Sequence, residues 1–119
     1  MNPALGLATA RLVIGGTALV APDLGSKLFR LDAVGNPQLP YMTRLFASRE
    51  IVLGAATLLT SGKTRRNLVL AGIAVDAADA AAAWLAGEDR TVDRTTAALL
   101  TAPAVAAVVA GVVGVATGT

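Results

Sequence analysis

Apolar residues dominate this chain in four runs, each long enough to cross the hydrocarbon core of a bilayer as a helix. A core of roughly 30 Å needs about 20 apolar residues at a rise of about 1.5 Å per residue. The runs cover about residues 4–21, 41–60, 67–86 and 95–116, and most of the charged residues lie between them. The pattern therefore predicts an all-α integral membrane four-helix bundle, with residues 1–119 forming a single domain.

The last and the first runs differ most in polarity. The last run has no ionisable side chain after Arg94, and its Pro103 is tolerated if a neighbouring helix satisfies the freed carbonyl. The first run contains Arg11, so an amphipathic helix lying in the membrane interface is the alternative. Small residues at helical spacing around Arg11 favour a spanning helix packed in a bundle. A cleavable signal peptide is disfavoured because a basic segment is missing before the apolar run.

The amino-acid composition indicates that lipid surrounds the protein, and it excludes several kinds of functional site. Of the 119 residues, 55% are hydrophobic and 15% are charged, and the mean hydropathy of +0.65 exceeds that of a typical water-soluble domain. The chain has no cysteine and no histidine, which excludes disulfides, thiolate sites and histidine-based catalysis or metal binding. Basic residues are scattered and not interleaved with aromatics, so we expect no nucleic-acid partner. No cofactor, metal site or catalytic residue is predicted.

Five ionisable residues lie deep inside the predicted spans, where a lone charge costs about 2.5–3.5 kcal/mol on insertion scales. Helical spacing puts two of them on one face of the third span, together with small residues, and two others on adjacent stripes of the second span. Because an ionised side chain is costly to expose to lipid, we expect these side chains to face one another, a water-filled cavity or a ligand. We therefore expect a charge network that joins the first three spans, formed by Arg11, Arg49, Glu50, Asp76 and Asp79.

This set holds two positive and three negative groups, so one negative charge is in excess. Either Arg44, near the start of the second span, joins the network, or one carboxyl carries a proton, or a cation is bound. Two interpretations follow. The residues form a buried ion-pair network that fixes helix pairing without chemistry, or they line a polar pocket for a proton, a cation or a polar head group.

Two further features concern packing and orientation. In the last span, Gly111, Gly114 and Gly118 predict a helix-packing face made of small residues. The short turn after the second span carries three basic residues within positions 63–66, which favours the cytoplasm for this turn. Both termini would then lie on the cytoplasmic side of the inner (plasma) membrane.

The chain resembles small four-span bacterial membrane proteins, of a type common in actinobacteria, whose function is not known. The resemblance covers most of the chain. Its most specific part is the Arg-Glu pair at 49–50 together with the Asp-x-x-Asp pattern at 76–79. It implies a four-helix membrane bundle and implies no activity. Small multidrug exporters carry an essential glutamate on the first span, where this chain has Arg11, so that class does not fit.

These observations predict a non-enzymatic accessory or scaffold protein, or a binder of a lipid-like ligand, with an intramembrane charge network. Its partners would be the lipid bilayer and either another membrane protein or further copies of the chain. The alternative is a small proton- or cation-coupled transporter or channel that acts as a homo-oligomer. An enzyme that uses Asp76 and Asp79 as a metal-binding or acid/base pair is a weaker alternative, because two carboxylates with no histidine or third acidic ligand beside them along the chain make a poor magnesium site.

Overall fold

The structure, a computed structural model, describes residues 2–118 and is built from α-helices alone within that range. Alanine and leucine, which favour helix, fill the apolar runs, and glycine, proline and charged residues mark the turns. Proline stands in the first turn of the first three helices, where its missing N–H costs no hydrogen bond. The helices are α1 (Pro3–Val20), α2 (Pro22–Leu28), α3 (Leu39–Leu59), α4 (Gly62–Glu88) and α5 (Arg94–Ala116). The all-α prediction is confirmed.

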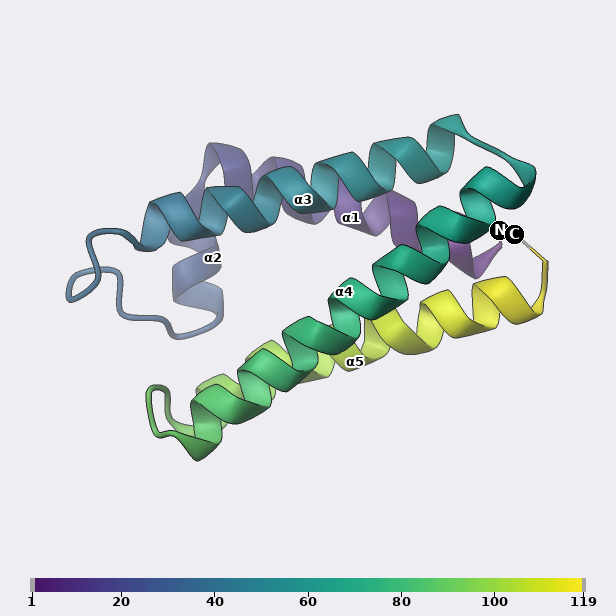
Figure 1. Cartoon of the computed structure of the whole chain (residues 1–119). Helices are drawn as coiled ribbons and strands as arrows, with labels where there is room; N and C mark the ends of the chain where they lie inside the picture. The colour runs from purple at the N-terminus through teal and green to yellow at the C-terminus, as the bar shows by residue number, and fades with distance from the viewer. Residues whose placement is uncertain (1, 119) are drawn as a thin grey trace.

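The four long helices form two antiparallel pairs, α1 with α3 and α4 with α5 (Figure 1). The pairs converge at the end of the molecule that holds both chain ends and diverge toward the other end, where α2 lies (Figure 1). At the convergent end, Asn2 Nδ2 donates a hydrogen bond to the carbonyl oxygen of Gly118 at 2.9 Å. The turn between α3 and α4 lies at this same end (Figure 1). The basic turn and the described chain ends therefore share one side of the molecule.

Three helices, α1, α4 and α5, are long and apolar enough to cross a membrane. The sequence predicted four such helices, and the second one is the difference. Helix α3 occupies the expected segment, but its 21 residues include Arg44, Arg49 and Glu50, which make it too polar to qualify on its own composition. The three apolar helices indicate a membrane protein.

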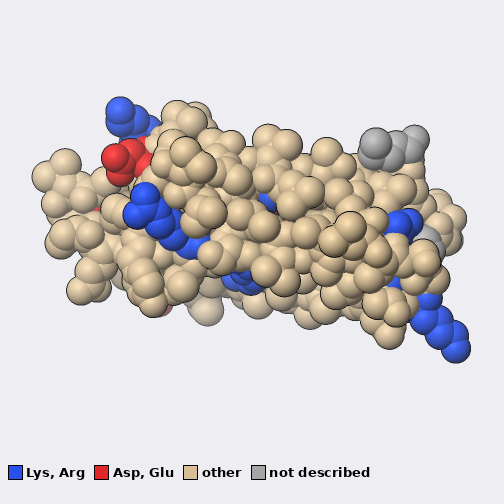
Figure 2. Space-filling view, turned by 90° about the horizontal axis from the view of Figure 1, so that it is seen from above, with Lys and Arg blue, Asp and Glu red and all other residues tan. Residues whose placement is uncertain are grey.

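Small residues form the interior, and large apolar side chains face outwards. Val20 and Leu59 are 82% and 85% exposed. On the face seen in Figure 2, charged residues gather toward the two ends of the molecule, and the surface between them is mainly uncharged. A water-soluble domain buries its large apolar side chains, whereas membrane helices pack through small ones and offer the large ones to lipid. The buried apolar residues are Ala4, Ala8, Ala18, Ala47, Val69 and Ala83.

The glycine stripe predicted on the last span packs through two of its three members. A Cβ added to Gly114 would lie 2.9 Å from Cβ of Ala4 in α1, and one added to Gly111 would lie 2.7 Å from Cγ1 of Ile73 in α4. Gly118 lies beyond the end of α5 with a φ of +85°, and a Cβ added to it would meet no atom within 4 Å. It ends the helix in the left-handed conformation that glycine adopts readily, and it does not extend the packing face.

Helix α5 begins at an aspartate cap outside the apolar segment. The Oδ1 atom of Asp93 accepts a hydrogen bond from the backbone N–H of Thr96 at 2.7 Å. This bond, with a smaller contribution from the nearby Arg30 charge, lowers the pKa of Asp93 below its ordinary value of 3.8. The stabilisation by the ionised cap is therefore complete above that value and is lost as the pH falls through the lower pKa of the folded state.

We expect Asp93→Ala to accelerate amide hydrogen exchange in the first turn of α5 at pH 7, because the Thr96 N–H loses its acceptor. Acidification of the native protein should likewise lower the protection of these amides, expressed relative to their intrinsic exchange rate at each pH. Mass spectrometry of exchanged peptides measures it, and Asp23→Ala, in the first turn of α2, is the matched control. Unchanged exchange in Asp93→Ala would mean that the cap does not hold this turn.

A candidate functional site in the middle of the helices

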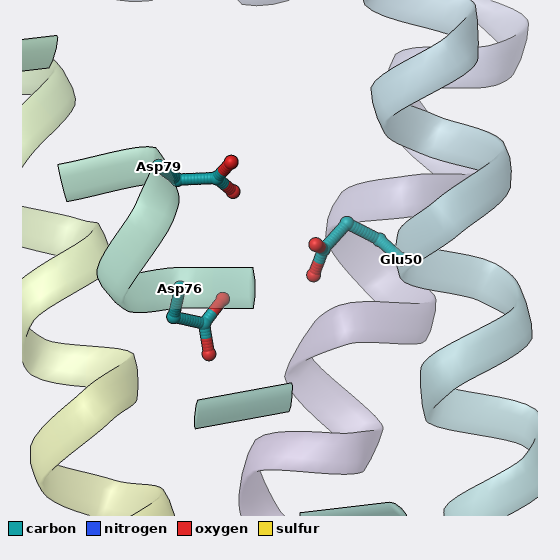
Figure 3. Close-up of side chains that lie close together, drawn as sticks. All are labelled: Glu50, Asp76 and Asp79. Carbon is teal, nitrogen blue, oxygen red and sulfur yellow. The ribbon is translucent and has the colours of Figure 1, made fainter. Parts of the chain in front are cut away.

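The ionisable residues predicted inside the spans meet near the middle of α1, α3 and α4. The carboxyl groups of Glu50 on α3 and of Asp76 and Asp79 on α4 face one another in Figure 3. Arg11 of α1 and Arg49 of α3 make ion pairs with them. We call this set the charge network, and it consists of Arg11, Arg49, Glu50, Asp76 and Asp79. It joins the α1–α3 pair to α4.

Arg11 is the centre of the buried half of the charge network. Its Nη1 donates to Oε2 of Glu50 at 2.7 Å and to Oδ1 of Asp76 at 3.1 Å. Its Nη2 donates to Oδ2 of Asp76 at 2.5 Å, so the guanidinium and the aspartate form a two-pronged pair. All three side chains are almost completely buried. One guanidinium thus links three helices.

Small residues make room for this guanidinium. A Cβ added to Gly72, one turn before Asp76 on α4, would lie 2.9 Å from Nη2 of Arg11. On the other side, a Cβ added to Gly54 would lie 3.2 Å from Cβ of Arg11. The sequence places Gly72 and Asp76 on one helical face at i and i+4, and the structure shows that the arginine side chain occupies the space above the glycine.

The other half of the charge network is more open. Arg49 Nη2 donates to Oδ2 of Asp79 at 2.5 Å and lies 3.5 Å from Oε1 of Glu50. The Arg49 and Asp79 side chains are 37% and 33% exposed. The Arg49 guanidinium also stacks over the ring of Phe46, 5.3 Å from the ring centroid. An ion pair midway along apolar helices therefore reaches the outer surface.

Arg44 lies outside the charge network. Its Nε donates to the carbonyl oxygen of Leu19 at 3.1 Å, at the exposed end of the α1–α3 pair. Arg44 therefore does not balance the third carboxyl group of the charge network. With two guanidinium groups and three carboxyl groups, the charge network has a formal charge of −1 when every member is ionised.

Two buried polar atoms of the described side chains have no hydrogen-bond partner: Nε of Arg49 and Oε1 of Glu50. Orphaned polar atoms of this kind are rare in folded proteins, because each forfeits its hydrogen bonds to water without a replacement. Both atoms belong to the charge network. The pairing of the charge network is therefore incomplete where its two halves meet, between Arg49 and Glu50.

The three carboxyl groups are close enough to share a small cation, since one oxygen from each lies within 4.8 Å of the others. Two guanidinium groups already bond to these carboxyl groups. A cavity of about 10 Å³ beside Arg11 has room for about one water molecule. The arrangement is thus suited to holding charge, a proton or one small ion, and not to enclosing an organic substrate.

Two contacts of the polar residues were missed at the sequence level. Arg30 and Asp93 form an exposed ion pair at 3.4 Å that links the loop after α2 to the start of α5. Arg65 Nε donates to the carbonyl oxygen of Thr57 at 3.0 Å across the basic turn. Neither of these two contacts corresponds to a recognisable sequence motif, so only the three-dimensional structure reveals them.

Comparison with known proteins finds no relative for this chain: no family model, no curated protein and no solved structure matches it. The functional conclusion therefore depends on the geometry of the charge network and on the outward-facing apolar surface.

Proposed function

We propose that this protein is a small, non-enzymatic integral membrane subunit with four spanning helices, which serves as an accessory or scaffold component of a membrane assembly. The charge network ties its two helical pairs together. The observation that carries the proposal is the partly exposed Arg49–Asp79 ion pair midway along otherwise apolar helices. A charged pair at that depth is costly against lipid and is normally covered by protein.

The packing of α3 against its neighbours supports the proposal that α3 also spans the membrane. Helix α3 packs along the whole of α1, which is itself long and apolar enough to span. Its Glu50 is covered by Arg11, and its Arg49 is paired with Asp79, so the charges that make α3 polar are largely neutralised inside the molecule. A helix whose ionised groups face partners inside a bundle inserts at much lower cost than an isolated one.

The inner membrane, with both termini in the cytoplasm, is the location that we favour for this protein. The basic turn supports this orientation through Lys63, Arg65 and Arg66. The opposite end of the molecule also carries basic residues, among them Arg30 and Arg94. Orientation therefore stays a prediction, which labelling from one side of sealed vesicles would decide.

The proposal is tested by the mass of the particle extracted from its own membrane. We expect native mass spectrometry in a mild detergent to find an assembly heavier than the 11.9 kDa chain. The double substitution Arg49→Leu with Asp79→Leu leaves the formal charge of the charge network unchanged but removes its exposed part. We expect this variant to insert into the membrane and to be released as a single chain, because the polar contact to the partner is gone.

Arg44→Leu is the control, since Arg44 is exposed and lies outside the charge network. It should leave the assembly intact. A native protein that is extracted as a single 11.9 kDa chain would refute the role as a subunit.

A proton- or cation-coupled transporter is the other function considered. It is less well supported, because transport needs a path to each side of the membrane, and the charge network is packed with guanidinium groups beside a cavity of about 10 Å³. The excess negative charge of the charge network is the one feature that favours a transporter. This charge also has a simpler consequence, which concerns Glu50.

A further inference from the structure

Glu50 shares each of its two guanidinium neighbours with an aspartate: Arg11, at 2.7 Å, also binds Asp76, and Arg49, at 3.5 Å, also binds Asp79. Arg11 directs both Nη atoms at Asp76, at 3.1 and 2.5 Å, and Arg49 donates to Asp79 at 2.5 Å. These contacts make two neutral pairs. Glu50 lies between them, with Oε2 accepting a bond from Nη1 of Arg11 at 2.7 Å. Its Oε1 lies 3.5 Å from Nη2 of Arg49 but accepts no hydrogen bond.

Burial makes this leftover charge costly. The Glu50 side chain is only 6% exposed and lies midway along α3. The charged groups that face it are Arg11 from α1, Arg49 from its own helix, and Asp76 and Asp79 from α4. An ionised Glu50 leaves this set at −1 with an oxygen that receives no hydrogen bond, whereas a neutral Glu50 brings it to zero.

We propose that Glu50 is a proton-binding site, with the proton held on Oε1. The proton comes from water, and its uptake changes the formal charge of the charge network from −1 to 0. Protonation converts Oε1 from an acceptor without a donor into a donor, while Oε2 keeps its bond from Arg11. Carboxylate oxygens of Asp76 and Asp79 lie within 4.8 Å of a Glu50 oxygen, a separation that one intervening water or a side-chain rotation closes.

This inference needs only the buried charge network and not the partner proposed above, so the two can fail separately. The sequence makes the test direct, because the chain has only two glutamates, Glu50 and Glu88. Glu88 is exposed at the end of α4 and serves as an internal reference. Glutamate labelled with carbon-13 at its side-chain carboxyl therefore gives two NMR signals, and Glu88→Gln assigns them.

In lipid nanodiscs at pH 7 and low sodium, we expect the Glu88 carbon to show the chemical shift of a carboxylate and the Glu50 carbon that of a protonated carboxyl. Two carboxylate signals would overturn the proposal. Sodium chloride is then added, with choline chloride as the control salt. A Glu50 signal that moves with sodium alone would also overturn it, because the occupant would be a metal ion.

A stability comparison gives an independent answer. Glutamine is a neutral replacement of the same shape as a protonated glutamate, so Glu50→Gln should keep the melting temperature of the native protein. Asp76→Asn removes a charge that is paired with Arg11 and should lower it. If Glu50→Gln lowers the melting temperature as much as Asp76→Asn does, Glu50 is an ionised partner and the proposal is wrong.

Discussion

Replacing Arg11 by leucine is expected to destabilise the folded protein by about 3–5 kcal/mol, the usual cost of removing one partner from a buried ion pair. Arg11 provides the hydrogen bonds that Asp76 and Oε2 of Glu50 accept inside the molecule. Without it, Asp76 remains buried as an unpaired carboxylate. Equilibrium unfolding in mixed micelles, with increasing amounts of a denaturing detergent, measures the loss.

Two companion variants show whether the loss arises from the unpaired charge. Arg44→Leu removes an exposed arginine from the same protein and should change stability by no more than about 0.5 kcal/mol. Asp76→Leu in the Arg11→Leu background removes the orphaned carboxylate and should recover much of the loss. If Arg11→Leu were as stable as the native protein, the charge network would not hold the helical pairs together.

The second large effect is expected at Gly54, where α3 crosses α1 at close range. A Cβ at this position would lie 2.7 Å from the carbonyl oxygen of Ala8, a backbone atom that cannot turn away. Gly54→Ala should therefore separate the two helices and cost about 1–3 kcal/mol, as overpacking does in other interiors. The same unfolding experiment measures it.

Gly16→Ala is the matched control, because a Cβ there meets nothing within 4 Å. Alanine favours helix over glycine by up to about 1 kcal/mol, so this variant should be as stable as the native protein or slightly more stable. Equal effects of the two substitutions would mean that the close approach of α1 and α3 does not exist in the membrane.

The helices were predictable because run length and helical periodicity are local properties of the sequence. The segment 41–60 is helical as expected, and the structure begins α3 at Leu39 and ends it at Leu59. This segment is not apolar enough to qualify as a span on its own composition, because it contains Arg44, Arg49 and Glu50. The neutralisation of Arg49 and Glu50 depends on α1 and α4, which lie far away along the chain.

The members of the charge network were also predictable, because an ionisable side chain deep in an apolar run needs a partner. Which arginine pairs with which carboxylate was not. That choice depends on how far each helix is rotated and where the pairs cross, and the space above Gly72 decides it in favour of Arg11 with Asp76. Arg44 was one of three possible sources of the missing positive charge, but it lies near the start of α3, where its Nε donates to the carbonyl oxygen of Leu19.

The hydrogen bond between Asn2 and Gly118 makes the path of the chain almost a closed ring. The turn between α3 and α4 lies beside this closure (Figure 1). A circular permutant, joined by a short linker from Gly118 to Asn2 and opened in that turn, would be synthesised with the α4–α5 pair first. The same side chains would still meet at the crossing of the two pairs. The order in which the halves leave the ribosome is thus independent of the contacts that unite them.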